Sequence, residues 1–173
     1  ANNLGGTGTI NSSSVFRYSG TAASGTPSTL TYNRNIGDIE VTAGALRLLS
    51  NSVGTVQNLR VSGGTFDLQG GTNTFTSISL TGGTLANGNY KTAEASFTNL
   101  QTGTVSGSLV STNSTQKLIK NSAGTLTLSG FNSFANAALE VSAGTVAITT
   151  ANALNGVGVL DMKGGILDLG GVG

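Results

Sequence analysis

A glycine flanked on both sides by alternating apolar residues recurs along this chain about every twenty residues. These glycines follow one another at intervals of 20, 19, 20, 21, 20 and 21 residues: Gly44, Gly64, Gly83, Gly103, Gly124, Gly144 and Gly165. A repeat of constant length restricts the possible folds severely, because each copy forms the same unit and buries its apolar face against the next copy.

Apolar residues fill four fixed positions around these glycines. The fifth residue before the glycine is Ile39, Leu59, Ile78, Thr98, Ile119, Leu139 and Leu160 in successive copies. The third residue before it is Val41, Val61, Leu80, Leu100, Asn121, Val141 and Met162. The second residue after it is Leu46, Phe66, Leu85, Val105, Leu126, Val146 and Leu167. The fourth is Leu48, Leu68, Asn87, Gly107, Leu128, Ile148 and Leu169, so four positions in all are not apolar.

Alternation with a period of two residues on each side of the glycine predicts two short strands and no helix. The glycine suits the bend between them, because it reaches positive φ and lets neighbouring backbones approach closely. One copy cannot enclose its own apolar residues, so successive copies must stack as parallel strands. We therefore predict an all-β fold, a right-handed parallel β-solenoid (β-helix) with about 20 residues per coil.

The segments that return from one coil to the next share a second pattern of glycine, asparagine and aromatic residue. It occurs in "LQGGTNTF" (68–75), "LANGNY" (85–90) and "LSGFNSF" (128–134). We expect the asparagines to form hydrogen bonds along the coil axis, and Phe75, Tyr90 and Phe134 to fill the interior.

The repeat also predicts which charged residues meet on adjacent coils. In this register Glu40 lies beside Arg60, Arg47 beside Asp67, and Lys120 beside Glu140. One adverse contact is expected, between Glu140 and Asp161. Exposed ion pairs contribute only about 0 to 1 kcal/mol each, so this agreement supports the register more than the stability.

We divide the chain into an irregular entry region at 1–35 and a solenoid of about seven repeats at 36–173. The entry region lacks the apolar positions and contains the single proline, Pro27. Its segments "SVFRYSG" and "STLTYNR" still resemble strands. Because the chain begins at Ala1 without an initiator methionine or signal segment, and stops after the strand-like "DLGGVG", we expect it to be a fragment of a longer protein.

Composition excludes several classes of function. The net charge is +1, with eight scattered basic residues, which gives no footprint for nucleic acid or an anionic membrane. No run of eighteen apolar residues is available to insert into a bilayer. Histidine and cysteine are both absent, so catalytic triads, Cys-His dyads and ordinary zinc sites cannot form.

The remaining candidates for chemistry are weak. Asp38 and Glu40 share a strand face, but no acid or basic companion is evident. Asp67 and Asp168 resemble the aspartates of calcium-binding glycine repeats, but they stand five coils apart and cannot share an ion. The "GGTGTI" segment lacks the Lys-Ser or Lys-Thr of a phosphate loop. The sequence therefore predicts no catalytic, cofactor-binding or metal-binding residue, no cofactor, and no enzymatic activity.

The stretch "GTLTLSGFNSFANAALEVSAGTVAI" (124–148) closely resembles the autotransporter-associated β-strand repeat, also called the passenger-associated transport repeat. The turns "VTAGALRL" and "VSGGTFDL" look like weaker copies, so the resemblance extends over residues 36–169. It implies a large secreted or surface-displayed bacterial protein in which the repeats form a right-handed β-helix and act as scaffold and stalk. "FANAAL" replaces the glycine-threonine return that is usual in the family.

These features predict a structural, non-catalytic segment on the bacterial outer surface or outside the cell: a stalk, an adhesin in cell adhesion, or an extracellular filament built by end-to-end stacking. Its expected partners are further coils, identical subunits, or cell-surface and matrix glycans. The alternatives are a β-helix carbohydrate-active enzyme, which needs clustered Asp, Arg or Lys, and a glycan-binding module, for which Tyr18 and Tyr32 are the available aromatic platforms.

Overall fold

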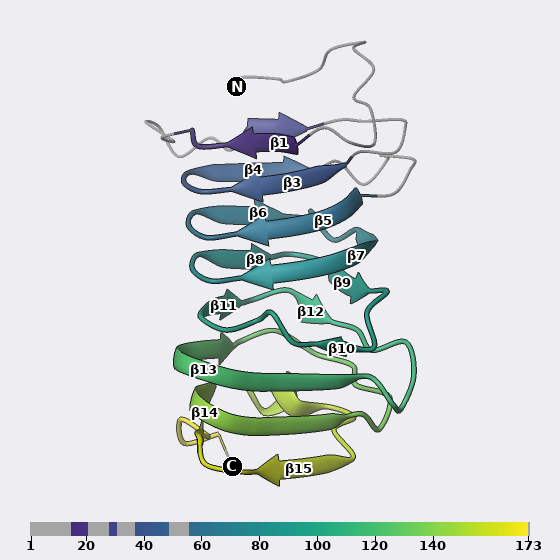
Figure 1. Cartoon of the computed structure of the whole chain (residues 1–173), viewed down its shortest axis with the longest axis vertical. Coiled ribbons are helices and arrows are strands. Elements are labelled where there is room, and N and C mark those ends of the chain that lie inside the picture. The colour runs from purple at the N-terminus through teal and green to yellow at the C-terminus, as the bar shows by residue number, and fades with distance from the viewer. Residues whose placement is uncertain (1–14, 21–27, 31–36, 49–55, 173) are drawn as a thin grey trace.

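A computed structural model describes residues 15–20, 28–30, 37–48 and 56–172, which form a rod of stacked coils (Figure 1). Every strand pairing in this part of the chain is parallel, and one short 3-10 helix, η1 (Ala151–Leu154), is the only helix in it. The fold is the predicted all-β solenoid of about seven turns. As the chain descends in Figure 1 its front strands run left and its rear strands right, which makes the coil right-handed.

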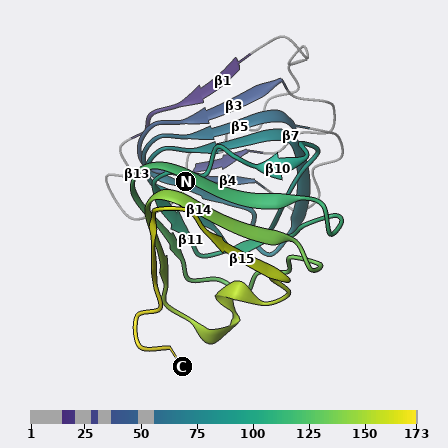
Figure 2. The same cartoon turned by 60° about the horizontal axis from the view of Figure 1, so that its bottom comes forward.

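Two sheets run along the rod. The first has the order β1-β3-β5-β7-β9-β12, formed by β1 (Val15–Tyr18), β3 (Asp38–Val41), β5 (Val56–Val61), β7 (Thr72–Leu80), β9 (Asn89–Thr92) and β12 (Ser108–Leu109). The second has the order β15-β14-β13-β11-β8-β6-β4-β2, formed by β15 (Val159–Met162), β14 (Ala138–Ile148), β13 (Lys117–Leu128), β11 (Gly103–Val105), β8 (Thr84–Ala86), β6 (Thr65–Asp67), β4 (Ala45–Leu48) and β2 (Ser28–Leu30). Two further strands, β10 (Ser96–Phe97) and β16 (Ile166–Asp168), pair with β13 and β14. The long strands β13 and β14 curve around one corner of the coil, as the turned view in Figure 2 shows.

The predicted register holds throughout the first coils. Ile39 pairs with Leu59 and Leu59 with Ile78, so these three residues form one file, a row of equivalent side chains along the rod axis. Val41, Val61 and Leu80 form the neighbouring file. All six side chains are at most 2% exposed. The matching residues about twenty positions apart therefore stack inside the rod, as the repeat requires.

Aromatic rings fill the interior between the two sheets. Phe75, Tyr90 and Phe134 are buried, as the return pattern predicts. Phe66 joins them, with its ring centroid 6.2 Å from that of Phe75 and 6.4 Å from that of Tyr90. The Tyr90 hydroxyl lies within hydrogen-bond distance of the Phe66 and Ala86 carbonyls, and burial raises the pKa of this phenol far above its ordinary value.

The corner glycines are needed for both reasons that the sequence suggests. Gly44, Gly64, Gly83 and Gly144 have φ between 66° and 77°. A Cβ atom on Gly83 would lie 2.3 Å from the carbonyl oxygen of Gly64, and one on Gly64 would lie 2.3 Å from that of Gly44. Stacked corners therefore approach too closely for any side chain.

The predicted register is wrong on β10, on the first part of β13 and between β11 and β13, whereas Leu100 pairs with Leu80 and Leu126 with Val146 as predicted. Leu118, not Ile119, pairs with Leu139, and Lys120, not Asn121, pairs with Val141. The register then shifts between Lys120 and Thr125, where β13 carries one more residue than β14. This β-bulge reverses which residues point inward, because side chains alternate along a strand.

The structure accounts for two non-apolar positions of the repeat, Thr98 and Gly107. Phe97, not Thr98, pairs with Leu118, and Val105 pairs with Leu128 instead of Leu126. A Cβ atom on Gly107 would lie 2.8 Å from Cε2 of Tyr90, so the tyrosine ring occupies the interior space that an aliphatic residue fills in other coils.

Within the predicted entry region, the structure describes only residues 15–20 and 28–30. The strands expected in "SVFRYSG" and "STLTYNR" are confirmed as β1 and β2, which pair in register with β3 and β4. Pro27, "GGTGTI" and Tyr32 lie outside the described residues, and the boundary at residue 36 stays a prediction.

Candidate functional surfaces

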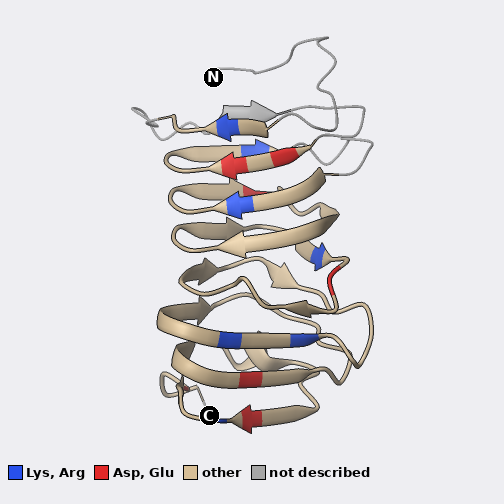
Figure 3. Cartoon of the chain, in the orientation of Figure 1, with Lys and Arg blue, Asp and Glu red and all other residues tan. Residues whose placement is uncertain are grey.

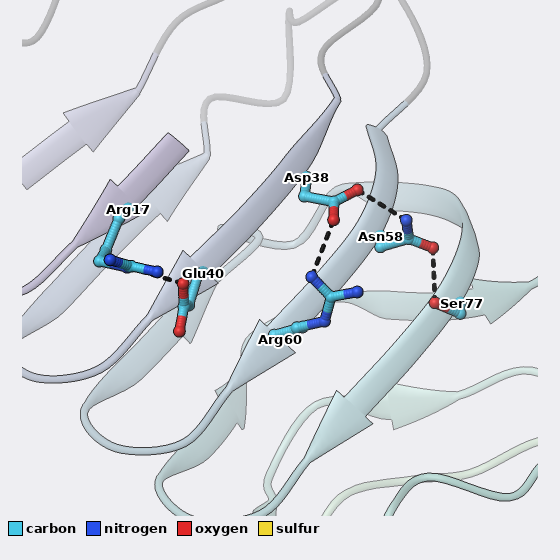
Figure 4. Close-up of polar contacts among 6 residues, drawn as sticks. All are labelled: Arg17, Asp38, Glu40, Asn58, Arg60 and Ser77. Atoms are coloured by element: carbon cyan, nitrogen blue, oxygen red, sulfur yellow. Dashed lines mark hydrogen bonds and ion pairs between the residues drawn. The ribbon is translucent and has the colours of Figure 1, made fainter. Parts of the chain in front are cut away.

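Ion pairs and hydrogen bonds connect neighbouring coils on the outer face of the first sheet (Figure 4). Arg17 Nε lies 2.7 Å from a Glu40 carboxylate oxygen, and Arg60 lies 2.8 Å from Asp38. The backbone places Glu40 beside Arg60 as predicted, but each side chain takes a different partner. Asp38 and Glu40, which the sequence suggested as a weak candidate for a catalytic carboxylate pair, therefore form two separate ion pairs between coils.

Asp38 also begins a short polar chain that crosses three coils. Its second oxygen accepts a hydrogen bond from Asn58 Nδ2 at 2.6 Å, and Asn58 Oδ1 accepts one from the Ser77 hydroxyl at 2.6 Å (Figure 4). The Asn58 side chain thus connects Asp38 on the preceding coil to Ser77 on the following coil. Such contacts fix the register of adjacent strands.

The two aspartates of the rejected calcium hypothesis lie apart. Asp67 forms the predicted pair with Arg47, Nε to Oδ2 at 3.2 Å, and lies beside Ala86 on the next coil. Asp168 accepts a hydrogen bond from the backbone N–H of Gly170 and lies beside Ala147. Within the described ranges, no three acidic, histidine or cysteine side chains are grouped so that they could hold a metal ion.

Lys120 departs most from its predicted place. It does not meet Glu140 but lies fully buried in the file of Val141, where its ammonium donates to the backbone carbonyl of Ser122 and lies 3.4 Å from that of Ala143. Burial lowers the pKa of this amine. No residue pattern indicates this position, because lysine is rarely fully buried.

The buried lysine predicts a pH dependence of stability. In the folded state Lys120 loses its proton at a lower pH than the ordinary lysine value of 10.5, so below that value the unfolded chain binds more protons. The free energy of unfolding of the wild type should therefore rise, relative to that of Lys120→Met, as the pH increases toward 10.5. Urea titrations of both proteins at several pH values measure this difference, and parallel pH profiles would contradict it.

Glu140 binds two other lysines instead. Its oxygens lie 3.0 Å from Lys163 Nζ and 3.7 Å from Lys117 Nζ. Lys163 also lies 3.4 Å from Asp161, so one ammonium bridges the two carboxylates that the sequence placed in adverse contact. These contacts raise the pKa of Lys163, with the hydrogen bond to Glu140 as the largest cause.

One asparagine of the return segments bonds along the axis in both directions, as predicted. Asn132 is fully buried; its Oδ1 accepts a hydrogen bond from the Leu109 N–H at 2.7 Å, and its Nδ2 donates to the Ala153 carbonyl at 2.7 Å. The Asn89 amide donates to the Thr72 hydroxyl of the preceding coil. The structural interpretation of these asparagines is therefore supported by their contacts.

The aromatic platforms expected for glycan binding are not supported at the described position. Tyr18 pairs with Val41 and packs against the core instead of facing outward. Phe131, which the sequence analysis did not single out, is 56% exposed. Phe131 is the only exposed aromatic residue in the described ranges, and one ring does not form an extended glycan-binding platform.

The C-terminal end of the rod exposes residues of the interior files. Leu160 and Met162 pair with Leu139 and Val141 and continue their files, yet they are 48% and 43% exposed. Charged residues lie on coils along most of the rod, although β7, β8, β11 and β12 carry none (Figure 3). Sequence periodicity placed these apolar residues inside, whereas the structure leaves them partly exposed.

No helix among the described residues is long and apolar enough to cross a membrane. Residues 118–148, which comprise most of β13 and all of β14, match a family model described as passenger-associated-transport-repeat. The resemblance expected from the sequence is confirmed for this segment. Comparisons with curated proteins and with solved structures found no match.

Proposed function

Because residues 118–148 form a passenger-associated transport repeat, we propose that this chain is a structural, non-catalytic stalk segment of a bacterial surface protein. Repeats of this family belong to autotransporter passengers, which are extracellular or surface-exposed, and the solenoid fits a surface repeat protein of that type. In this role the coils hold other parts of the protein at a fixed distance from the cell.

The observation that carries this proposal is the use of charge along the rod. Five carboxylates form ion pairs with lysine or arginine: Asp38, Glu40, Asp67, Glu140 and Asp161. All of these ion pairs except that of Lys163 with Asp161 join different coils. The polar groups are thus arranged to hold coils together. A carbohydrate-active enzyme would instead direct several of them toward one substrate position.

An in-register deletion tests the stalk role. Removal of residues 61–79 joins Arg60 to Leu80, which takes the position of its partner Val61. We expect a folded protein that is shorter by one coil, about 5 Å, as measured by circular dichroism and small-angle X-ray scattering. The matched control removes residues 61–69, which puts the following strands out of register, and should unfold. Unfolding of both deletions would contradict a modular stalk.

Location and activity are tested on the full native protein and the purified chain. Antibodies against the chain should label intact cells and lose their target after brief external protease treatment. Labelling that requires permeabilised cells would contradict surface display. Release of reducing ends from a polysaccharide by the purified chain would favour the enzyme alternative, and selective signals on a glycan array would favour a binding module.

A further inference from the structure

We propose that Asn113 is an acceptor site for an N-linked glycan, to which a transferase attaches a sugar from a diphosphate-activated donor. The residue begins the triplet Asn113-Ser114-Thr115, in which a hydroxyl residue follows the asparagine by two positions. Asparagines in such triplets accept glycans where they lie on surface loops of secreted proteins. The inference uses the surface location of the proposed function, but it concerns a modification that the stalk role does not require.

The triplet is uncommon in this chain despite its many asparagines. One other asparagine, Asn11, has serine or threonine two positions later, and it lies outside the described residues. Asn113 is therefore the acceptor triplet whose surroundings the structure describes.

The triplet lies in an exposed turn between β12 and β13. Residues 112–115 are all exposed, and the Asn113 carbonyl accepts a hydrogen bond from the Gln116 N–H at 3.4 Å, which closes a four-residue turn. Both ends of this turn are anchored. The Ser111 hydroxyl donates to the Asn113 carbonyl at 2.6 Å, and the buried Gln116 amide donates to the Glu94 carbonyl of the preceding coil at 2.7 Å. The rod therefore presents Asn113 to solvent in a defined conformation.

The side-chain oxygen of Asn113 makes the contacts that stabilise the turn. Oδ1 accepts hydrogen bonds from the Thr115 N–H at 3.0 Å, the Thr115 hydroxyl at 2.7 Å and the Gln116 N–H at 3.0 Å. Among the described residues, Nδ2 has one long contact, 3.4 Å from the Thr112 hydroxyl. The nitrogen is thus the part of the amide that the turn does not need.

Other asparagines of the rod use this nitrogen to join coils. Nδ2 of Asn58 donates to the Asp38 carboxylate, and Nδ2 of Asn132 donates to the Ala153 carbonyl. A glycan on either nitrogen would break a contact between coils. A glycan on Asn113 would leave every hydrogen bond of Oδ1 in place.

The hydroxyl of Thr115 is the group that suits the triplet to this reaction. An amide nitrogen is a weak nucleophile, because its lone pair is delocalised into the carbonyl. A hydroxyl that donates to Oδ1 stabilises the negative charge that this oxygen acquires as Nδ2 loses a proton, and it therefore activates the nitrogen. Nδ2 then attacks the anomeric carbon of the sugar. The C–N bond forms as the bond from that carbon to the diphosphate breaks, the diphosphate leaves with the electron pair, and the proton passes to a base of the transferase.

Peptide mass spectrometry of the full protein, recovered from the surface of the cells that produce it, tests the site. After denaturation, trypsin releases residues 92–117, which contain both Asn113 and Asn99. We expect this peptide to carry one or more sugar residues, located on Asn113 by fragmentation. Asn99 is also exposed but has Gln101 at the hydroxyl position, so it should stay unmodified. An unmodified peptide, or sugar only on Asn99 or on serine and threonine, would overturn the inference.

Three substitutions separate the acceptor nitrogen from the turn. Asn113→Asp keeps an oxygen for the three hydrogen bonds and removes the nitrogen, so this variant should fold and reach the surface without the sugar. Thr115→Ala should also lose the sugar, whereas Thr115→Ser, which keeps the hydroxyl, should retain it. Circular dichroism and surface labelling check that each variant is folded and displayed. Sugar on Asn113→Asp, or on residue 113 of Thr115→Ala, would contradict the proposed chemistry.

Cell fractionation distinguishes two sources of the donor, a sugar diphosphate linked to a nucleotide or to a lipid. Modified peptide in the cytoplasmic fraction indicates the soluble nucleotide-linked donor, and modified peptide only outside the cytoplasm indicates the lipid-linked donor. Either result supports the site.

The outcomes for the two proposals are distinguishable. A displayed rod that shortens on deletion of residues 61–79 but carries no sugar on Asn113 would refute the glycan and leave the stalk role intact. Sugar on Asn113 of a chain whose deletion variant unfolds would refute the stalk role and leave the glycan site intact.

Discussion

Gly83→Ala is expected to destabilise the protein by about 2 to 5 kcal/mol, which combines the cost of a left-handed alanine with that of overpacking. The residue has φ +77°, and the new Cβ atom would lie 2.3 Å from the Gly64 carbonyl oxygen. Backbone atoms of stacked coils cannot move aside singly, so the corner must open. Equilibrium urea unfolding followed by circular dichroism measures the loss.

Gly70→Ala is the matched control. Gly70 has φ +82°, but no atom lies within 4 Å of the Cβ that alanine would add. It should therefore lose only the conformational part, about 1 to 2 kcal/mol. Equal losses at Gly70 and Gly83 would show that the corners do not approach as closely as the structure has them.

Phe66→Ala should destabilise the protein by about 3 to 5 kcal/mol, the usual cost of removing a buried aromatic ring. Phe66 is 0% exposed, and its ring meets those of Phe75 and Tyr90 edge to face. The cavity would lie at the centre of the rod, where neighbouring coils cannot collapse without breaking both sheets.

Phe131→Ala removes the same ring from an exposed position. Because Phe131 is 56% exposed, the free energy of unfolding should change by no more than about 0.5 kcal/mol. Similar losses from the two substitutions would contradict the division into interior files and outer face.

The first coils could be predicted in detail because their glycines mark true structural equivalents. Gly44, Gly64 and Gly83 all occupy the same corner, so counting from them gives the correct inward residues. Small residues, alternation and stacking all favour one register there. When small residues, alternation and stacking all indicate the same register, that register can be predicted from the sequence.

The failure around Lys120 has a physical cause. Gly124 lies 21 residues after Gly103 and 20 residues before Gly144, so the spacing of the glycines shows no irregularity. The β-bulge between Lys120 and Thr125 nevertheless adds one residue to the corner. Counting backwards from Gly124 therefore assigns the wrong inward-facing residues. In the observed register Leu118 lies in the interior file of Leu139, and Lys120, two residues later, is therefore buried as well. Backbone carbonyls at the corner compensate that amine, and no pattern of residue types encodes them.

The candidate surfaces were predictable in part. The pair of Arg47 and Asp67 followed from the register alone, since both residues extend from directly opposed positions. The diagonal contact of Arg60 with Asp38 did not, because long side chains reach neighbours that lie off their own file. The exposure of Leu160 and Met162 depends on which coils pack against β15 and not on the residues of that repeat, so periodicity does not predict it.

Distances between pairs of spin labels test most directly the claim that residues about twenty apart lie in files along one axis. Thr42→Cys would be combined in turn with Ser122→Cys, Ser142→Cys and Lys163→Cys, positions four, five and six coils away on the same corner. Electron paramagnetic resonance should give backbone separations of about 19, 24 and 29 Å, a constant increase of one strand spacing per coil. Separations that do not increase with coil number would contradict the solenoid and every conclusion drawn from it.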